Sequence, residues 1–243
     1  MGKLDDKVAL VTGSSSGIGR GIARALAAEG ATVVLAARRA DRLRATVDEI
    51  VAAGGTALAV PTDVSSETDI ERLFATTLER FGRLDILVNN AGTGVLGPLD
   101  ELSVEDWDRV LAVNLRGPFL CTRQALRIMK RQRGGRIINI GSISAQRVRP
   151  NNGPYNASKF GIDGLTHSTA LEGRPYGISC GALHPGNTSS ELNQDPNMSI
   201  SREPRMEVEE LAQAALVMAT LPPHVNMFQA IVVPVEQLYV GRG

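Results

Sequence analysis

Short runs of apolar, mostly β-branched residues alternate along this chain with longer stretches that have helical periodicity. The apolar runs predict seven strands, at residues 8–11, 32–37, 56–61, 84–89, 136–141, 178–183 and 230–234. The stretches between them predict helices at residues 18–29, 42–53, 66–81, 103–133 and 155–172. Strict alternation of this kind implies right-handed crossovers between parallel strands. The pattern therefore predicts an α/β fold, a doubly wound parallel sheet of seven strands with helices on both faces.

Local signals refine this pattern at three places. Ser66, with Asp69 three residues later, suits the N-cap of the helix at 66–81. Gly117-Pro118 predicts a break or kink in the long helical region at 103–133. Residues 187–205 are rich in Ser, Asn and Pro and predict a long substrate loop that holds at most a short helix.

Length and composition bound the class of protein. A chain of 243 residues suits one domain over residues 1–243. Its 26 Lys and Arg balance its 26 Asp and Glu, so neither nucleic acid nor an anionic membrane is favoured as a partner. No signal peptide is recognisable, and no apolar run approaches the roughly 20 residues that span a bilayer. Cys121 and Cys180 are expected to be buried thiols rather than a disulfide. We expect a cytoplasmic protein without a metal site.

A glycine-rich turn follows the first predicted strand, with the spacing G-x-x-x-G-x-G. Gly13 permits a tight turn, Gly17 lets the backbone approach a pyrophosphate, and Gly19 lets the helix pack close to the sheet. The N-terminus of that helix offers free N–H groups to phosphates. No Gly-Lys-Ser/Thr follows, which excludes a P-loop. A plain structural turn is the alternative, but the position between a strand and a helix favours a Rossmann-type dinucleotide site. The residues expected to contact the cofactor there are Gly13, Ser15, Ser16, Gly17, Ile18 and Gly19.

The end of the second strand bears on which dinucleotide binds. Sites for NAD usually place an acidic residue here to hold the ribose 2′-hydroxyl. This chain has Ala37 followed by Arg38 and Arg39. Because a guanidinium suits the 2′-phosphate, we predict NADP(H), with Arg38 as first choice and Arg39 as second. The alternative is a solvated basic loop.

Tyr155 and Lys159 stand four residues apart in a predicted helix, so they share one face. Free tyrosine has a pKa of about 10, and ionising it near neutral pH needs about 4 kcal/mol. An ammonium group about 4 Å away supplies roughly that energy at an effective dielectric constant of about 20. The pair therefore predicts a general acid–base whose pKa Lys159 lowers. A surface Tyr–Lys stacking pair would have the same spacing.

Ser142 follows the fifth strand directly. Open α/β sheets bind ligands outside the carboxyl ends of their strands. A hydroxyl at that place can donate to a substrate carbonyl and polarise it, although position alone favours an ordinary turn serine.

Together, these motifs resemble the short-chain dehydrogenase/reductase family over nearly the whole chain. The glycine turn is similar to the family's cofactor motif. The further motifs that resemble the family's, in chain order, are Asp63-Val64, Asn89-Asn90-Ala91-Gly92, Asn114, Ser142, Tyr155-Asn156-Ala157-Ser158-Lys159 and Pro185-Gly186. It is the ordered set, rather than any one motif, that makes the resemblance specific.

The resemblance implies roles for these residues. Tyr155 would be the general acid in reduction and the base in oxidation, with Lys159 also holding the nicotinamide ribose. Ser142 would orient the substrate oxygen, and Asn114 would hold a water that links Lys159 to solvent. The further cofactor contacts implied are Asp63, Val64, Asn90, Ala91, Gly92, Tyr155, Lys159, Pro185, Gly186 and Thr188.

The chain departs from the family pattern near its sixth strand and its C-terminus. Thr188 stands where an aliphatic residue is common, and Ser190 where threonine is frequent, which leaves the substrate side undefined. His184 precedes the turn, where a backbone-anchoring or partly buried role is favoured over catalysis. Residues 234–243 lack the usual Asp-Gly-Gly.

Three functions remain open at this point. The leading hypothesis is an NADP(H)-dependent oxidoreductase that reduces a ketone or aldehyde, or oxidises the matching alcohol, by direct hydride transfer. A non-catalytic NADP-binding regulator is the second, although all four catalytic positions are filled. The third is a 3-oxoacyl-acyl-carrier-protein reductase, in which Lys130, Arg131 and Arg133 would dock an acidic carrier. Tyr176 stands where such reductases often have a further basic residue, so a solvated helix end is the favoured interpretation of the basic run.

The resemblance also implies a homotetramer or homodimer that binds a small-molecule carbonyl or alcohol. An apolar face on the two long helices would serve as the interface, although a buried core face has the same pattern. Its candidate residues are Ala112, Leu115, Phe119, Leu165 and Leu171.

Overall fold

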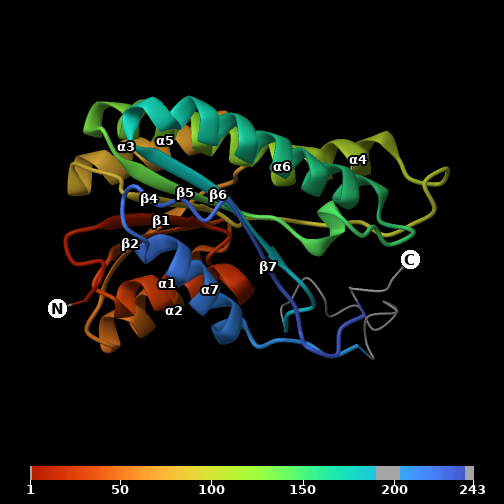
Figure 1. Cartoon of the computed structure of the whole chain (residues 1–243), viewed down its shortest axis with the longest axis horizontal. Coiled ribbons are helices and arrows are strands. Elements are labelled where there is room, and N and C mark those ends of the chain that lie inside the picture. Colours follow the sequence, from red (N-terminus) through yellow and green to blue (C-terminus); the bar gives the residue numbers. More distant parts are fainter. Residues whose placement is uncertain (1, 190–202, 239–243) are drawn as a thin grey trace.

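A computed structural model describes residues 2–189 and 203–238. Seven parallel strands form one sheet in the order β3-β2-β1-β4-β5-β6-β7 (Figure 1). The strands are β1 (Val8–Thr12), β2 (Thr32–Ala37), β3 (Thr56–Pro61), β4 (Ile86–Asn89), β5 (Gly135–Ile140), β6 (Ile178–Pro185) and β7 (Gln229–Val232). The predicted Rossmann-type α/β sheet is confirmed.

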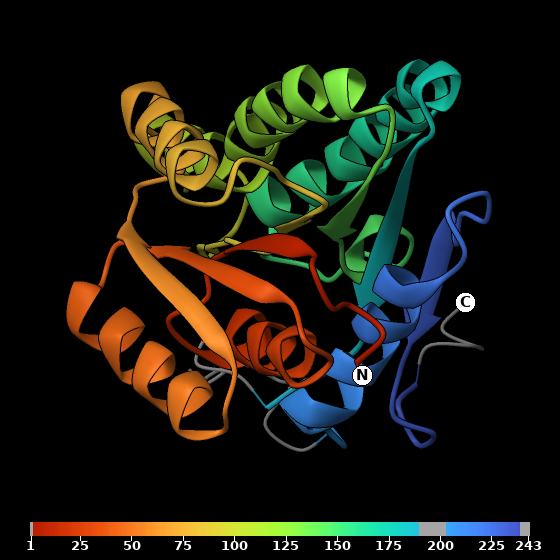
Figure 2. The same cartoon turned by 90° about the vertical axis from the view of Figure 1, so that its left-hand side faces the viewer.

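Helices cover both faces of the sheet (Figures 1 and 2). The long helices are α1 (Gly17–Ala28), α2 (Ala40–Ala52), α3 (Glu67–Phe81), α4 (Val104–Leu111), α5 (Gly117–Gln132), α6 (Gly153–Gly173) and α7 (Val208–Thr220). The short ones are η1 (Ala112–Arg116), η2 (Ile143–Ala145) and η3 (Arg174–Tyr176). One apolar cluster lies between the sheet and α1, α2 and α7, and a second lies between the sheet and α3 and α5.

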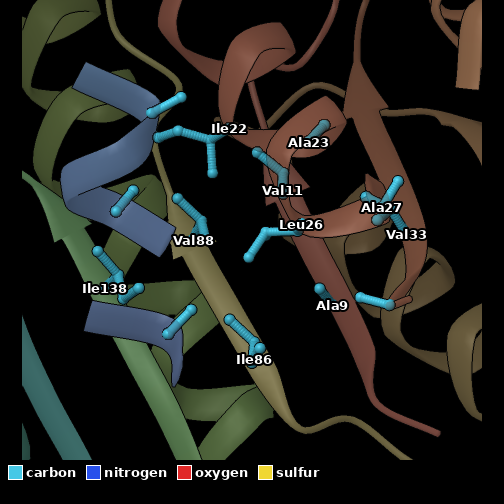
Figure 3. Packing of buried hydrophobic residues seen from close by; sticks show 14 of the residues in the cluster. Ala9, Val11, Ile22, Ala23, Leu26, Ala27, Val33, Ile86, Val88 and Ile138 are labelled. Carbon is cyan, nitrogen blue, oxygen red and sulfur yellow. The ribbon is translucent and has the colours of Figure 1, made fainter. Parts of the chain in front are cut away.

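The central strands are buried on both faces because each contributes side chains to both clusters. Ala9 and Val11 of β1 meet α1 at Ile22 and Leu26, as Figure 3 shows, whereas Leu10 points into the opposite cluster. This two-sided burial explains why the strands appear in the sequence as continuous apolar runs rather than alternating ones.

The strand order reverses between β1 and β4. The chain builds outward from β1 through β2 to β3, returns, and places β4 on the other side of β1. Connections on the two sides then diverge above the carboxyl ends of β1 and β4, which leaves a crevice.

The long helical region predicted at 103–133 is not broken at Gly117-Pro118 but consists of three consecutive helical segments, α4, η1 and α5. Its middle, η1, is a π-helix that ends just before Gly117. Pro118 has no N–H to donate back to Asn114, so the α-helical hydrogen-bond ladder is interrupted and the turn widens.

Helix α7 is missing from the sequence-based prediction. Glu207 caps it in place of the usual Ser or Thr, and its side chain and that of Glu210 form a reciprocal capping box. The buried positions Leu211, Ala215 and Met218 have helical spacing, which is a signal that could have revealed it.

The predicted loop at 187–205 is described only at its ends. Thr188 pairs with Met206 in an isolated parallel bridge, so these ends lie side by side. Ser190 and the remainder of the loop up to residue 202 lie outside the described residues, as do residues 239–243.

The two cysteines are free and buried, as predicted. Burial raises the pKa of both Cys121 and Cys180 to about 12, so neither is a thiolate at neutral pH.

Candidate active site

A cleft of about 480 Å³ opens above the carboxyl ends of the strands, at the point where the strand order reverses. Its walls come from the loops after β1, β2, β3, β4 and β5, from α4 and η1, and from α6. The lining residues are Gly13, Ser15, Ser16, Gly17, Ile18, Ala37, Arg38, Arg39, Thr62, Asp63, Val64, Asn90, Ala91, Gly92, Thr93, Arg109, Val113, Ile140, Gly141, Tyr155, Lys159 and Pro185.

The glycine turn forms the floor of the cleft at the N-terminus of α1. Gly13 has a φ of 66°, a left-handed conformation that favours glycine. A Cβ on Gly19 would lie 2.5 Å from the carbonyl oxygen of Gly13, so α1 approaches the turn more closely than a side chain permits. Asn90 holds this turn, since its Nδ2 donates to the carbonyl oxygens of Thr12 (2.9 Å) and Gly13 (3.2 Å).

The arginines after β2 stand at one end of the cleft in different surroundings. The guanidinium of Arg39 donates to the hydroxyls of Ser15 (3.2 Å) and Ser16 (2.9 Å), so it lies over the glycine turn. Arg38 instead acts on Asp63. Burial raises the pKa of the Asp63 carboxyl, but hydrogen bonds from Ser65 and the charge of Arg38 outweigh it and hold that pKa below its usual value. The Asp63 carboxylate therefore lies within the field of Arg38.

The sequence-predicted acid–base residues meet at the opposite end of the cleft. The Nζ atom of Lys159 lies 5.4 Å from the ring centroid of Tyr155, one helical turn away on α6. Lys159 donates a 2.8 Å hydrogen bond to the carbonyl oxygen of Ile140, the last residue of β5. Ser142, two residues beyond that strand end, is hydrogen-bonded to the Tyr155 side chain.

The protonation of this pair differs from the sequence-based expectation. Burial raises the pKa of Tyr155, and it is the hydrogen bond with Ser142 that opposes this rise. Burial also lowers the pKa of Lys159 to about 8, against the attraction of Asp163. The prediction that Lys159 lowers the pKa of the phenol is not met in this structure, because it omitted the cost of burying both charged forms.

Asn114 lies in the π-helical segment and its side chain is buried. Its Oδ1 accepts from the N–H of Thr93 (2.8 Å), and its Nδ2 donates to the carbonyl oxygen of Thr93 (2.8 Å) and to the hydroxyl of Ser158 (3.1 Å). The amide thereby joins the loop after β4 to α6. Both N–H donors of the side chain therefore have protein partners, and the amide fixes the position of η1 against these two elements.

A family model described as short chain dehydrogenase matches residues 7–200. This chain belongs to the short-chain dehydrogenase/reductase family. As a member, it is an oxidoreductase that acts on CH–OH or C=O groups, and the sequence-based assignments of family and enzyme class are confirmed.

Curated members of the family resemble this chain over most of its length. A 3-oxoacyl-[acyl-carrier-protein] reductase of Synechocystis is 40% identical over 198 residues, which is 81% of this chain and 80% of the relative. A 3beta-hydroxysteroid dehydrogenase of Mediterraneibacter gnavus is 39% identical over 201 residues, 82% of this chain and 72% of the relative.

Solved structures of family members superpose closely. A metagenomic short-chain oxidoreductase in complex with NADP has a TM-score of 0.86 at 35% identity, covering 97% of this chain and 100% of that one. An alcohol dehydrogenase from Thermococcus sibiricus, complexed with 5-hydroxy-NADP, has a TM-score of 0.87 at 31% identity, covering 95% and 97%.

Five residues that the family resemblance or the glycine motif placed at the cofactor or substrate do not line the cleft. Gly19 lies beneath the turn. The side chain of Asn114 is hydrogen-bonded to Thr93 and Ser158, and that of Ser142 to Tyr155. Gly186 donates its N–H to the carbonyl oxygen of Val232 (2.7 Å), and Thr188 donates its hydroxyl to the carbonyl oxygen of Gly186 (3.2 Å). In this short-chain dehydrogenase/reductase, both residues therefore stabilise the chain beside the cleft.

Some lining residues were missed by sequence reasoning. Arg109 reaches the cleft from α4 and forms an ion pair with Asp106 (2.6 Å), and Val113 lies directly before Asn114. Their spacing of one helical turn on the cleft-facing side of this helical region was the available signal.

Within the described residues, no group of three His, Cys, Asp or Glu side chains is arranged to bind a metal ion. No helix in those residues is both long enough and apolar enough to cross a bilayer.

Proposed function

We propose that this protein is an NADP(H)-dependent oxidoreductase that interconverts a small ketone or aldehyde and its alcohol by direct hydride transfer. The observation that carries the proposal is the shared cleft of Tyr155 and Lys159 with the glycine turn. A dinucleotide and a proton donor can then act on one substrate at the same time.

The residues present fit NADP(H). The left-handed Gly13 and the N-terminus of α1 leave backbone N–H groups for a pyrophosphate. A Cβ at Gly13 would lie 2.7 Å from the Cα of Ala91, so the turn can take this shape only with glycine there. Arg38 and Arg39 would hold the 2′-phosphate, because charge-assisted hydrogen bonds favour it over a hydroxyl. The NADP complexes of two similar structures support this assignment.

In the proposed reaction, this chain's residues orient the substrate and move the proton. When bound, the nicotinamide supplies or accepts the hydride. The hydroxyl of Ser142 orients the substrate oxygen and donates a hydrogen bond to it. In reduction, Tyr155 gives its phenolic proton to that oxygen as the carbon gains hydride; in oxidation, it takes the proton back. Lys159, held by Ile140, stabilises the phenolate that remains.

The test is a panel of carbonyls and alcohols assayed with NADPH and NADH in parallel by absorbance of the reduced nicotinamide. We expect turnover with NADPH that is lost in Tyr155→Phe, while NADPH binding by fluorescence is retained. Tyr176→Phe, at a half-buried tyrosine outside the cleft, is the matched control. If no carbonyl or alcohol in a broad panel is turned over although NADPH binds, the regulator is the better assignment.

The 40% identical Synechocystis relative favours a second candidate, a 3-oxoacyl-acyl-carrier-protein reductase. The position of the basic residues that would dock the carrier, Lys130, Arg131 and Arg133, argues against this candidate. Lys130 and Arg133 lie over the ring of Tyr176, at 4.8 and 5.8 Å, at the C-terminal end of α5. This is where β5 begins, roughly 17 Å along the strand from the catalytic end. An acidic carrier docked there would be on the wrong edge of the sheet. Activity on 3-oxoacyl carrier protein that falls at moderate salt would restore this candidate.

Three further assignments remain proposals. We propose a homodimer or homotetramer formed through α5 and α6, where Phe119 and Leu171 are 46% and 61% exposed. We also propose a cytoplasmic location and one domain over residues 1–243.

A further inference from the structure

His184 and Asp163 face each other behind the catalytic wall of the cleft, from β6 and α6. The Nε2 atom of His184 and the Oδ1 atom of Asp163 are 3.3 Å apart, within ion-pair distance. The His184 side chain is fully buried, and both atoms are buried without a hydrogen-bond partner. Buried polar atoms are rarely left in that state, so the contact needs an explanation.

The other ring nitrogen settles which atom carries a hydrogen. Nδ1 of His184 lies 3.1 Å from the carbonyl oxygen of Ser142. A carbonyl only accepts hydrogen bonds, so Nδ1 is protonated. A neutral ring would then turn the lone pair of Nε2 toward a carboxylate oxygen, and the two would repel. A second proton on the ring converts this repulsion into an ion pair.

The charges around Asp163 favour its ionised form. Burial raises the pKa of the Asp163 carboxyl, and the charges of His184 on β6 and of His167 and Lys159 on α6 reduce that rise without cancelling it. Among the described residues these are the ionisable groups that act on this carboxyl. Because imidazole is the stronger base, the shared proton belongs on His184.

We propose that Asp163 and His184 form a buried carboxylate–imidazolium pair that positions Ser142 and Lys159, an inference that rests on the catalytic roles proposed above. His184 anchors the Ser142 backbone, and its ring packs so closely on Gly141 that a Cβ there would lie 2.5 Å from Nδ1. Asp163 lies one helical turn after Lys159, and its carboxylate favours the ammonium form of that lysine. Both are positioning residues, since they act through catalytic neighbours.

The ring nitrogens can be observed directly by ¹⁵N NMR of protein labelled in its three histidines. His167→Gln and His224→Gln assign the two exposed rings. At pH 8, we expect both ring nitrogens of His184 to be protonated. A neutral His184 at pH 8 would overturn the proposal. The wild-type spectrum decides this even if substitutions at Asp163 prevent folding.

Kinetics test the positioning role with Asp163→Asn, for which Glu172→Gln, an exposed carboxylate on the same helix, is the control. We expect kcat to fall at least roughly tenfold, because the catalytic groups lose their alignment. The KM for NADPH should change by less than about twofold. The alkaline limb of the kcat/KM profile should move to lower pH by about one unit, since Lys159 loses an opposite charge.

If kcat falls but the alkaline limb of the kcat/KM profile does not move, Asp163 has only a structural role, and the proposed effect on Lys159 is overturned. Failure of the proposed function is distinguishable, since the NMR experiment requires no turnover. A protein with an imidazolium at position 184 and no activity on any carbonyl would contradict the reaction and leave the pair in place.

Discussion

Gly19 lies directly against Gly13, so that a Cβ on Gly19 would be 2.5 Å from the Gly13 carbonyl oxygen and 2.3 Å from Nδ2 of Asn90. We expect Gly19→Ala to lower the free energy of unfolding by about 1–3 kcal/mol, because backbone atoms cannot yield easily. It should also weaken NADPH binding, since the displaced turn forms the cofactor floor. Urea unfolding and fluorescence titration measure the two effects.

Gly164 provides the matched control for this substitution. It lies within α6, and a Cβ there would meet nothing within 4 Å. Gly164→Ala should therefore raise the free energy of unfolding by about 0.5–1 kcal/mol by removing backbone entropy from the unfolded chain. Equal effects at the two glycines would contradict the proposed close approach at Gly19.

The lowered pKa of Lys159 predicts the pH dependence of carbonyl reduction. Burial places this pKa at about 8, so the ammonium form is lost as the pH rises through that value. We expect kcat/KM, which reports the free enzyme, to decline above about pH 8. If kcat/KM instead stays constant up to pH 10, then either Lys159 is less buried in solution than in this structure, or the reaction does not require its ammonium form.

The same group should make a contribution of opposite sign to stability. Because the pKa is lower in the folded chain than in the unfolded one, the unfolded chain binds more protons between about pH 8 and 10.5, and stability from this group rises with pH across that window. Lys159→Met should abolish turnover yet leave the urea midpoint at pH 7 no lower than in the wild type. A clear loss of stability would mean that the Ile140 hydrogen bond outweighs the cost of the buried charge.

The arginines after β2 predict cofactor preference. Arg38→Ala and Arg39→Ala should each raise the KM for NADPH roughly ten- to hundredfold. This range corresponds to the loss of one hydrogen bond to a charged group, which contributes about 1.5–3 kcal/mol. The KM for NADH should barely change, because it has no 2′-phosphate. Arg44→Ala, at an exposed position on α2, is the control. An unchanged preference in both variants would exclude these side chains from the phosphate site.

Assembly can be tested on the exposed apolar residues of α5 and α6. Sedimentation equilibrium of the wild type should give a dimer or tetramer. Phe119→Asp or Leu171→Asp should shift it toward the monomer, because a charge would be buried at the interface. Val217→Asp, at an exposed apolar position on α7 across the sheet, should leave the association unchanged. A monomeric wild type would reject the oligomer.

Features set by local sequence were predicted well. The strands at 32–37 and 56–61 match β2 and β3 residue for residue, and Ser66 caps α3 by accepting from the N–H of Asp69. The helical turn that joins Tyr155 to Lys159 follows from spacing alone. Each depends on neighbours within a few residues, where periodicity and capping chemistry act.

Features set by distant parts of the chain were not predictable in this way. The pKa values of Tyr155 and Lys159 depend on how completely other elements bury them, which spacing does not encode. The hydrogen bonds of the Asn114 side chain could not be predicted from the sequence, because their partners, Thr93 and Ser158, come from two different parts of the fold. The Asp163–His184 contact likewise joins residues that only the packing of α6 on β6 brings together.

The partner that holds Lys159 is the peptide carbonyl of Ile140, not a side chain. No point substitution can delete that oxygen, so the lysine's anchor persists through side-chain changes elsewhere in the cleft. Substitutions that change the substrate-binding walls of the cleft, whether natural or engineered, therefore leave the hydrogen bond that positions Lys159 in place.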